Sequence, residues 1–175
     1  DINFNERVND ARLLGVEKDS KKRFSGQRSW DFDVKHQGYR YHMSNIFASI
    51  GRVQLSKINF IEKKRKEIIS FYINNLRDMD QIKLLDFNYD DIISHIFVIK
   101  TSKRNKLREY LLNRNIECGI HYKPNHLLTK YKTNYSLPKT EKIYEEILTL
   151  PCHLDLTVLE QEKIVNVIKE FFNEK

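Results

Sequence analysis

Apolar positions change their spacing along the chain, and the changes mark distinct structural regions. Residues 1–16 place apolar side chains about one helical turn apart and predict an N-terminal helix. Residues 17–37 lack a sustained apolar period and predict a long loop, with a short extended piece from Trp30 to Val34. Residues 44–76 return to helical spacing and predict one helix about 45 Å long, which suits an element that bridges two lobes.

The rest of the chain alternates strand-like and helix-like segments. Runs rich in β-branched and aromatic residues predict strands at 82–87, 94–100 and 116–121. Helical spacing predicts helices at 103–114, at 139–149 and from Thr157 onward, where Glu160 completes a capping-box pattern. Residues 122–137 form a loop in this interpretation. The order of these elements predicts an α+β protein, divided as 1–43, 44–78 and 79–175.

Composition is that of a globular protein. The chain has 175 residues, of which 40% are hydrophobic and 31% are charged. No apolar run approaches the roughly 18 to 20 residues needed to span a bilayer, so we expect no membrane partner. Two cysteines, Cys118 and Cys152, are too few for a disulfide framework and favour a reducing, cytoplasmic location.

The net charge of +7 is open to several interpretations. A basic balance can serve nucleic acid, an anionic surface or a phosphorylated ligand, and AT-rich codon usage would also produce it. No helix-turn-helix, ribonucleoprotein motif or zinc finger is present, so we expect no nucleic-acid partner. The basic run Lys63–Lys66 would spread around a helix as a solvated face. Cys118 and His121 would point to opposite faces of one strand, so we expect no metal site.

One segment carries more information than any other. It reads Gly-Tyr-Arg-Tyr-His-Met-Ser-Asn over residues 38–45 and leads into a helix for which Ser44 is a suitable N-cap. Ala48, Gly51 and Gln54-Leu55 follow at fixed offsets. Alternation along an extended chain would place Tyr39 and Tyr41 on one side, and Arg40 and His42 on the other.

Four further segments occur with it in a set order: Asn9–Gly15, Ser94–Phe97, Gly119–Pro124 and Leu148–His153. With Gly38–Leu55, they resemble the DegT/DnrJ/EryC1/StrS family of sugar aminotransferases, which use pyridoxal phosphate (PLP). The resemblance covers nearly the whole chain.

The resemblance implies the C-terminal part of a PLP fold-type I aminotransferase. The expected parts are an N-terminal helix and long loop, a long interdomain helix, and a small domain with a short, mostly antiparallel sheet and helices. The lysine that forms the Schiff base with PLP lies upstream of the matched region in the family. We therefore expect no catalytic residue in this chain. The opening residue Asp1, in place of Met, also suggests a fragment.

The resemblance also implies site residues. The family loop at Gly38 helps to hold the PLP phosphate of the partner subunit, usually through an asparagine. Here that position is Arg40, whose guanidinium could bind a phosphate as a charged donor. Because arginine is longer than asparagine, Arg40 could instead reach the diphosphate of the substrate, or it could be a solvated surface residue. Substrate contacts are expected from Tyr39, His42, His95, His121 and Tyr122. The tyrosines could instead pack in a dimer interface, His95 could be an interior residue of its strand, and His121-Tyr122 could be a structural strand end.

The implied reaction moves an amino group from an amino acid, with glutamate expected, to a nucleotide-linked keto-sugar. The product would enter the synthesis of O-antigen or another surface polysaccharide. The expected partners are a second copy or an N-terminal half that supplies the lysine. An alternative is a non-catalytic remnant or interaction module that pairs with an intact aminotransferase.

Overall fold

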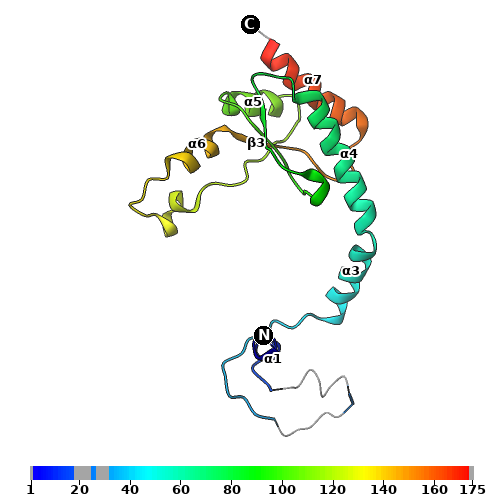
Figure 1. Ribbon diagram of the computed structural model, residues 1–175, viewed down its shortest axis with the longest axis vertical. Helices are drawn as coiled ribbons and strands as arrows, with labels where there is room; N and C mark the ends of the chain where they lie inside the picture. The colour runs from blue at the N-terminus through cyan, green and yellow to red at the C-terminus, as the bar shows by residue number, and fades with distance from the viewer. Residues whose placement is uncertain (1, 18–24, 27–31, 174–175) are drawn as a thin grey trace. The chain divides into compact units, whose positions relative to one another are not determined.

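A computed structural model describes residues 2–17, 25–26 and 32–173. Most of the predicted loop at 17–37, including Trp30 of the expected extended piece, lies outside these residues. The chain divides into two compact units, Asp1–Ser56 and Lys57–Lys175. Each unit is described by itself, and Figure 1 traces the elements of both.

The N-terminal helix of the first unit is shorter than the apolar pattern predicted. Helix α1 spans Ile2–Ala11. The chain then leaves the helix because its backbone pairs with a distant segment: Leu14 N–H donates to Tyr39 O at 3.0 Å, and Tyr41 N–H donates to Arg12 O at 2.9 Å. Leu13 and Arg40 form an antiparallel bridge between these bonds. The Gly38 loop is therefore held by the turn after α1.

The predicted helix at 44–76 forms as two helices. Helix α3 spans Asn45–Ser56 and α4 spans Ile58–Leu76. Lys57 between them has ψ near 2°, far from the helical value of about −42°, so the prediction of one continuous helix was wrong. The predicted N-cap is confirmed, since Ser44 Oγ accepts a hydrogen bond from Phe47 N–H at 3.3 Å.

The second unit is built on a three-stranded sheet. Strands β1 (Lys83–Leu84), β2 (Phe97–Lys100) and β3 (Ile147–Leu150) follow one another in that order, and both pairings are antiparallel. The expectation of a short antiparallel sheet is confirmed. Two segments differ from the prediction. Residues 116–121 contribute only the bridge Gly119↔Thr149, and the end of the helix predicted at 139–149 is strand β3.

Three helices and three short 3₁₀ turns complete this unit. The helices are α5 (Arg104–Leu112), α6 (Pro138–Glu146) and α7 (Val158–Asn173). The turns are η1 (Tyr89–Asp91), η2 (Asn125–Leu127) and η3 (Thr129–Tyr131). The capping box of the last helix is confirmed: Thr157 N–H donates to Glu160 Oε2 at 2.8 Å, and Glu160 N–H donates to Thr157 Oγ1 at 3.3 Å.

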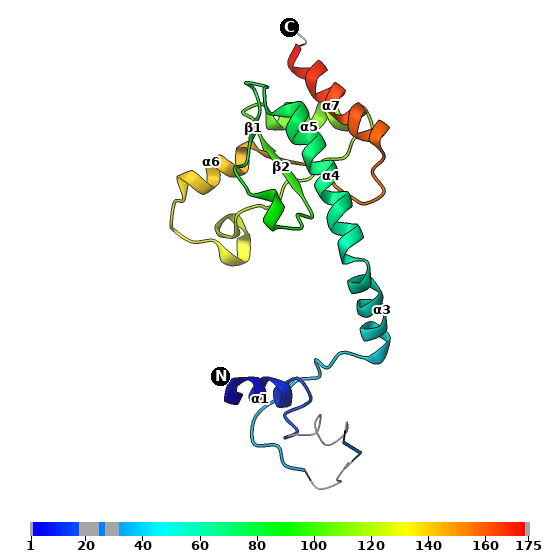
Figure 2. The ribbon, with the colours of Figure 1, turned by 45° about the vertical axis from the view of Figure 1, so that its right-hand side comes forward.

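One face of the sheet carries the hydrophobic core. Successive strand residues point to opposite faces, so Phe97 and Ile99 share a face with their register partners Leu150 and Leu148. All four belong to one buried cluster with side chains from α4, α5 and α7, among them Tyr72, Leu107, Leu111, Ile164 and Ile168. Figures 1 and 2 show α4, α5 and α7 gathered beside the sheet. The opposite face presents Thr149 and its register partner Val98.

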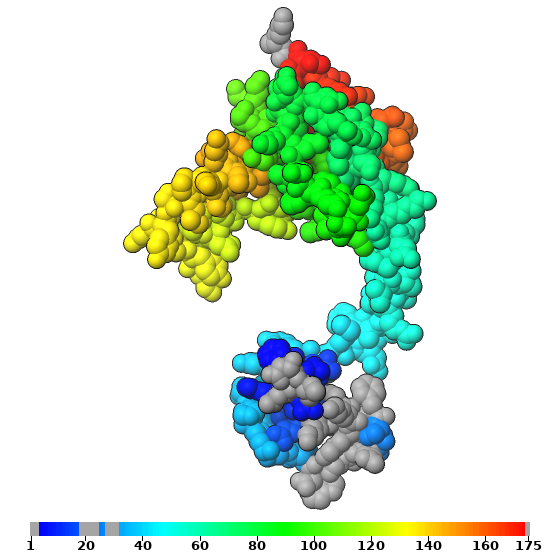
Figure 3. Space-filling view, in the orientation of Figure 1, coloured from blue at the N-terminus to red at the C-terminus, as the bar shows by residue number. Residues whose placement is uncertain are grey.

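The segment from residue 122 to α6 forms an arm. Residues 129–140 are all exposed, and Figure 3 shows this yellow arm standing out from the rest of the second unit. His126 Nε2 lies 3.0 Å from Glu141 Oε1, and the same oxygen accepts Leu137 N–H at 3.0 Å. These two bonds tie the loop to the first turn of α6. They also hold the pKa of the Glu141 carboxyl below its usual value, chiefly through the backbone N–H of Leu137.

Candidate functional site

The Gly38 loop presents its aromatic rings to solvent as a stacked pair. The rings of Tyr39 and Tyr41 lie 5.5 Å apart with an interplanar angle of 16°. They are 55% and 76% exposed. The prediction that these two tyrosines share one side of the loop is confirmed. Arg40 and His42, between and after them, are also exposed.

Arg40 meets the requirements of a phosphate ligand on this loop. Its backbone is fixed by the bridge to Leu13. Its guanidinium is exposed and forms no ion pair with any residue that the structure describes. An uncompensated guanidinium on a fixed backbone can donate two parallel hydrogen bonds to phosphate oxygens. The PLP phosphate therefore fits Arg40, which would supply one edge of a cofactor site.

Among the expected site residues of the second unit, His121 has a side chain that is held by a hydrogen bond. Its Nδ1 lies 2.9 Å from Thr149 Oγ1 on the face of the sheet opposite the core. Its ring meets the ring of Tyr122 edge-on, with centroids 4.6 Å apart at 82°. Tyr122 is 69% exposed, and His121 is half-buried. One fixed imidazole and one exposed phenol thus lie side by side.

His95 does not lie inside a strand. It precedes β2 and its side chain is exposed, so the alternative of an interior histidine was wrong. The segment before β2 is held by Arg65, whose guanidinium donates to Ser94 O at 3.1 Å, and by Ser94 Oγ, which donates to Ile96 O at 2.6 Å. His95 is thereby an exposed imidazole on a tethered loop.

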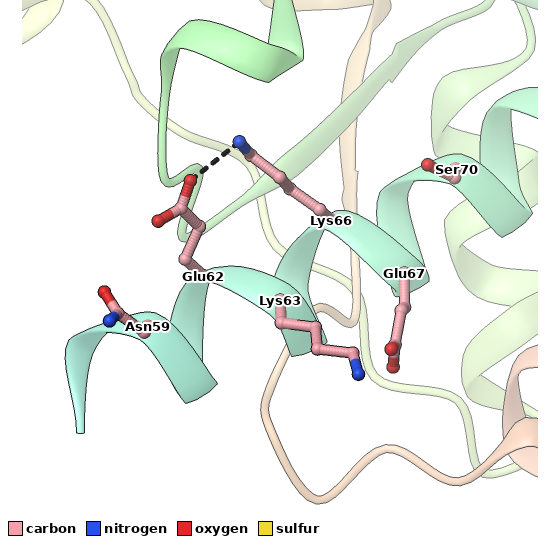
Figure 4. A pocket seen from close by; sticks show the side chains of 6 residues that line it. All are labelled: Asn59, Glu62, Lys63, Lys66, Glu67 and Ser70. Carbon is pink, nitrogen blue, oxygen red and sulfur yellow. Dashed lines mark ion pairs between the residues drawn. The ribbon is translucent and has the colours of Figure 1, made fainter.

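Helix α4 supplies that tether, a role that the sequence did not reveal. Lys66 Nζ donates to Asp90 O at 2.8 Å and pairs with Glu62 Oε1 at 2.7 Å. Figure 4 shows this pair, with Lys63 and Glu67 pointing away from it on the same helix. All six residues that line the depression in Figure 4 come from α4. The depression is therefore part of the charged surface of one helix, and no other element helps to enclose it. Two residues of the basic run Lys63–Lys66 thus hold neighbouring segments. Arg65 and Lys66 are half-buried and donate hydrogen bonds to the backbone of residues 94 and 90.

The cysteines lie in the core of the second unit. Cys118 and Cys152 are both buried and unbridged. Burial raises the pKa of the Cys118 thiol to about 12, so the thiolate that metal binding requires is disfavoured. Within the described ranges, no group of three or more His, Cys, Asp or Glu side chains could hold a metal ion. Among the residues that the structure describes, no helix combines the length and the apolar composition that a membrane-spanning segment needs.

The expected site residues thus fall into two sets. Tyr39, Arg40 and His42 share one loop of the first unit. His121 and Tyr122 are in contact in the second unit, and His95 lies there on a different segment. Sequence reasoning missed Arg65 and Thr149, which hold the histidine-bearing segments. A polar residue in an otherwise apolar strand was the available signal for Thr149.

Comparison with known proteins gives the family. The sequence matches the DegT/DnrJ/EryC1/StrS aminotransferase family over residues 1–169. The chain belongs to this family. A UDP-4-amino-4,6-dideoxy-N-acetyl-beta-L-altrosamine transaminase from Campylobacter jejuni is 28% identical in an alignment of 167 positions, gaps included, that covers 89% of this chain and 43% of that enzyme. An uncharacterized protein from Methanocaldococcus jannaschii is 30% identical in an alignment of 183 positions, gaps included, that covers 97% of this chain and 47% of that protein.

Solved structures of aminotransferases show the same fold. The aminotransferase TlmJ from Streptoalloteichus hindustanus superposes with a TM-score of 0.82 at 25% identity, over 98% of this chain and 46% of that one. The aminotransferase PseC from Helicobacter pylori superposes with a TM-score of 0.84 at 22% identity, over 100% of this chain and 47% of that one. The chain spans less than half the length of the curated relatives that it matches.

Proposed function

We propose that this chain is part of a PLP-dependent aminotransferase that acts on a nucleotide-linked keto-sugar. The observation that carries the proposal is the family match over residues 1–169, together with the similarity to a UDP-amino-sugar transaminase over 89% of the chain. The amino donor is an amino acid, and we propose glutamate. The product serves a surface polysaccharide such as O-antigen, and the reaction takes place in the cytoplasm.

The residues of this chain bind and orient in this proposal. Arg40 donates hydrogen bonds to the phosphate of PLP. His121 and Tyr122 bind the nucleotide-sugar, and Tyr39, His42 and His95 provide further contacts to it. PLP, when bound, supplies an electron sink for the amino-transfer chemistry. The lysine that holds PLP comes from outside residues 1–175, in a second chain or in a preceding half, and the working form is a homodimer or such a pair.

The alternative of an interaction module accounts equally well for one exposed apolar surface. Helix α3 has no buried residue, although its exposed side chains include Ile46, Phe47, Ile50, Val53 and Leu55. A helix that is apolar around most of its circumference is normally covered by other protein. Pairing with an intact aminotransferase, without any contribution to its active site, would also cover it.

An amino-transfer assay separates the two functions. The reaction contains ¹⁵N-glutamate, PLP and a UDP-linked 4-keto-6-deoxy-N-acetylhexose, and ¹⁵N in the sugar is measured by mass spectrometry. The chain is tested alone and with the separately expressed N-terminal half of a family member. We expect product only from the mixture, and at least a tenfold lower rate with Arg40→Met. The exposed Arg108→Met variant is the control. Absence of product from the mixture favours the interaction module, and a product rate that is unchanged in Arg40→Met contradicts the phosphate role of Arg40.

A further inference from the structure

The hydrogen bond between His121 and Thr149 joins two motifs that are far apart in the sequence. Gly119-Ile120-His121 and Leu148-Thr149-Leu150 are brought together because Gly119 and Thr149 exchange both backbone hydrogen bonds, at 3.0 and 2.8 Å. The side chain of His121 then folds back over this bridge, and its Nδ1 reaches Thr149 Oγ1 at 2.9 Å. The contact thus fixes a side chain of the substrate site to the sheet.

The hydroxyl of Thr149 has one side-chain hydrogen-bond acceptor within reach among the described residues, His121 Nδ1. Thr149 is 5% exposed, so its hydroxyl is shielded from water. A buried hydroxyl without an acceptor is costly, which favours the arrangement in which Oγ1 donates to an unprotonated Nδ1. The neutral imidazole then carries its proton on Nε2.

Gly119 makes room for this arrangement. A Cβ atom at residue 119 would lie 2.6 Å from His121 Cε1 and 3.2 Å from Nδ1. Both distances are shorter than contacts that a real Cβ tolerates without movement of its neighbour. Any larger residue at position 119 would therefore push the ring from its place over the bridge and away from Thr149.

We propose that Thr149 and Gly119 are positioning residues that fix His121 as an Nε2–H hydrogen-bond donor toward the nucleotide-sugar. This inference rests on the proposed function, in which His121 binds that substrate. The ligand group that such a donor takes is an oxygen acceptor, and the diphosphate of a nucleotide-sugar offers several. The ring of Tyr122 contacts the imidazole edge-on, with the centroids 4.6 Å apart.

The tautomer of His121 tests the proposal without any turnover. The full chain is labelled with ¹⁵N-histidine, and two-bond ¹H–¹⁵N spectra are recorded at pH 8 for the wild type and for Thr149→Ser, Thr149→Val and Gly119→Ala. We expect an unprotonated Nδ1 and a protonated Nε2 in the wild type and in Thr149→Ser. Thr149→Val and Gly119→Ala should give averaged signals of both tautomers. The exposed Thr129→Val is the control and should match the wild type.

Two results would overturn the proposal: an averaged or Nδ1-protonated His121 in the wild type, or an unchanged tautomer in Thr149→Val. If Thr149→Val unfolds, the tautomer of His121 in the wild type and in Thr149→Ser still tests whether His121 is an Nε2–H donor. Titration with UDP then addresses the proposed function. A shift of the Nε2 resonance that is lost in Thr149→Val supports the full proposal. A fixed tautomer with no response to UDP counts against the substrate role of His121, separately from its positioning by Thr149.

Discussion

Gly38 lies so close to Gly15 that neither position has room for a side chain. A Cβ atom on Gly38 would lie 1.9 Å from Gly15 N, and one on Gly15 would lie 2.3 Å from His36 O. Gly15 also has a φ of +79°, which residues with a side chain rarely adopt. This contact sets the start of the loop that carries Arg40.

Substitution of Gly38 by alanine should therefore release the loop. The amides of Tyr39 and Tyr41, which donate to Ala11 O and Arg12 O, should exchange with solvent at least about tenfold faster, equivalent to about 1.4 kcal/mol. Hydrogen exchange followed by NMR measures this. Gly51→Ala is the matched control, since a Cβ there meets nothing within 4 Å and alanine favours the helix. Equal protection in Gly38→Ala and wild type would refute the packing argument.

Loss of the Arg65 guanidinium should loosen the segment that carries His95. Arg65 donates to Ser94 O at 3.1 Å, and a hydrogen bond from a charged group contributes about 1.5–3 kcal/mol before solvent screening. In Arg65→Met we expect lower backbone ¹⁵N order parameters at residues 94–96, while those of β3 are unaffected. Lys63→Met on the exposed side of α4 is the control. A uniform change across the second unit would show that Arg65 supports the core and not this segment.

The capping box of α7 should stabilise the fold in a pH-dependent way. Hydrogen bonds from the backbone and side chain of Thr157 hold the pKa of Glu160 below its usual value. A carboxyl whose pKa is lower in the folded state contributes stability above its unfolded pKa of about 4.3, and loses it as the pH falls through the folded value. Urea unfolding should show that Glu160→Ala is more destabilising at pH 6 than at pH 3. Glu162→Ala, on the same helix, serves as control. An equal penalty for Glu160→Ala at both pH values would mean that its carboxylate is not the stabilising group.

The second unit should fold without the first. Every residue of its hydrophobic cluster, from Ile68 to Ile168, lies within Lys57–Lys175. A chain of residues 57–175 should melt cooperatively, within roughly 4 °C of the corresponding transition in the full chain, because removal of the first unit takes no side chain from this core. Calorimetry measures the melting transition, and the dispersion of NMR chemical shifts shows whether the shorter chain is folded. A broad, non-cooperative transition would show that the first unit completes the core.

The sequence predicted helix caps correctly, because a cap depends on a single residue type with a single physical role. Ser44 and Thr157 cap the helices that they were expected to cap, since a short side-chain acceptor before a helix satisfies its free N–H groups. The α+β class also followed from the pattern, and the short antiparallel sheet followed from the resemblance to the family. The tyrosine pair at 39 and 41 followed from alternation alone.

Tertiary context decided the elements that the pattern missed. Residues 147–150 are buried on both faces of the sheet, and such a short apolar run does not distinguish a strand from the end of a helix. The first helix ends at Ala11 because residues 12–14 pair with a loop more than twenty positions away, as the bond from Leu14 N–H to Tyr39 O shows. The sequence marked Thr149 as a polar residue in an apolar run but did not identify His121 as its partner, because that contact depends on the register that brings Gly119 beside β3.

The most direct test of the proposed function is a PLP titration followed by absorbance, borohydride reduction and peptide mass mapping. For the chain alone we expect no stoichiometric adduct on any single lysine. After addition of the N-terminal half of a family aminotransferase, we expect an adduct on a lysine of that half, with affinity for PLP that falls in Arg40→Met. A stoichiometric adduct on one lysine of residues 1–175 alone would contradict the central proposal that the lysine comes from outside this chain.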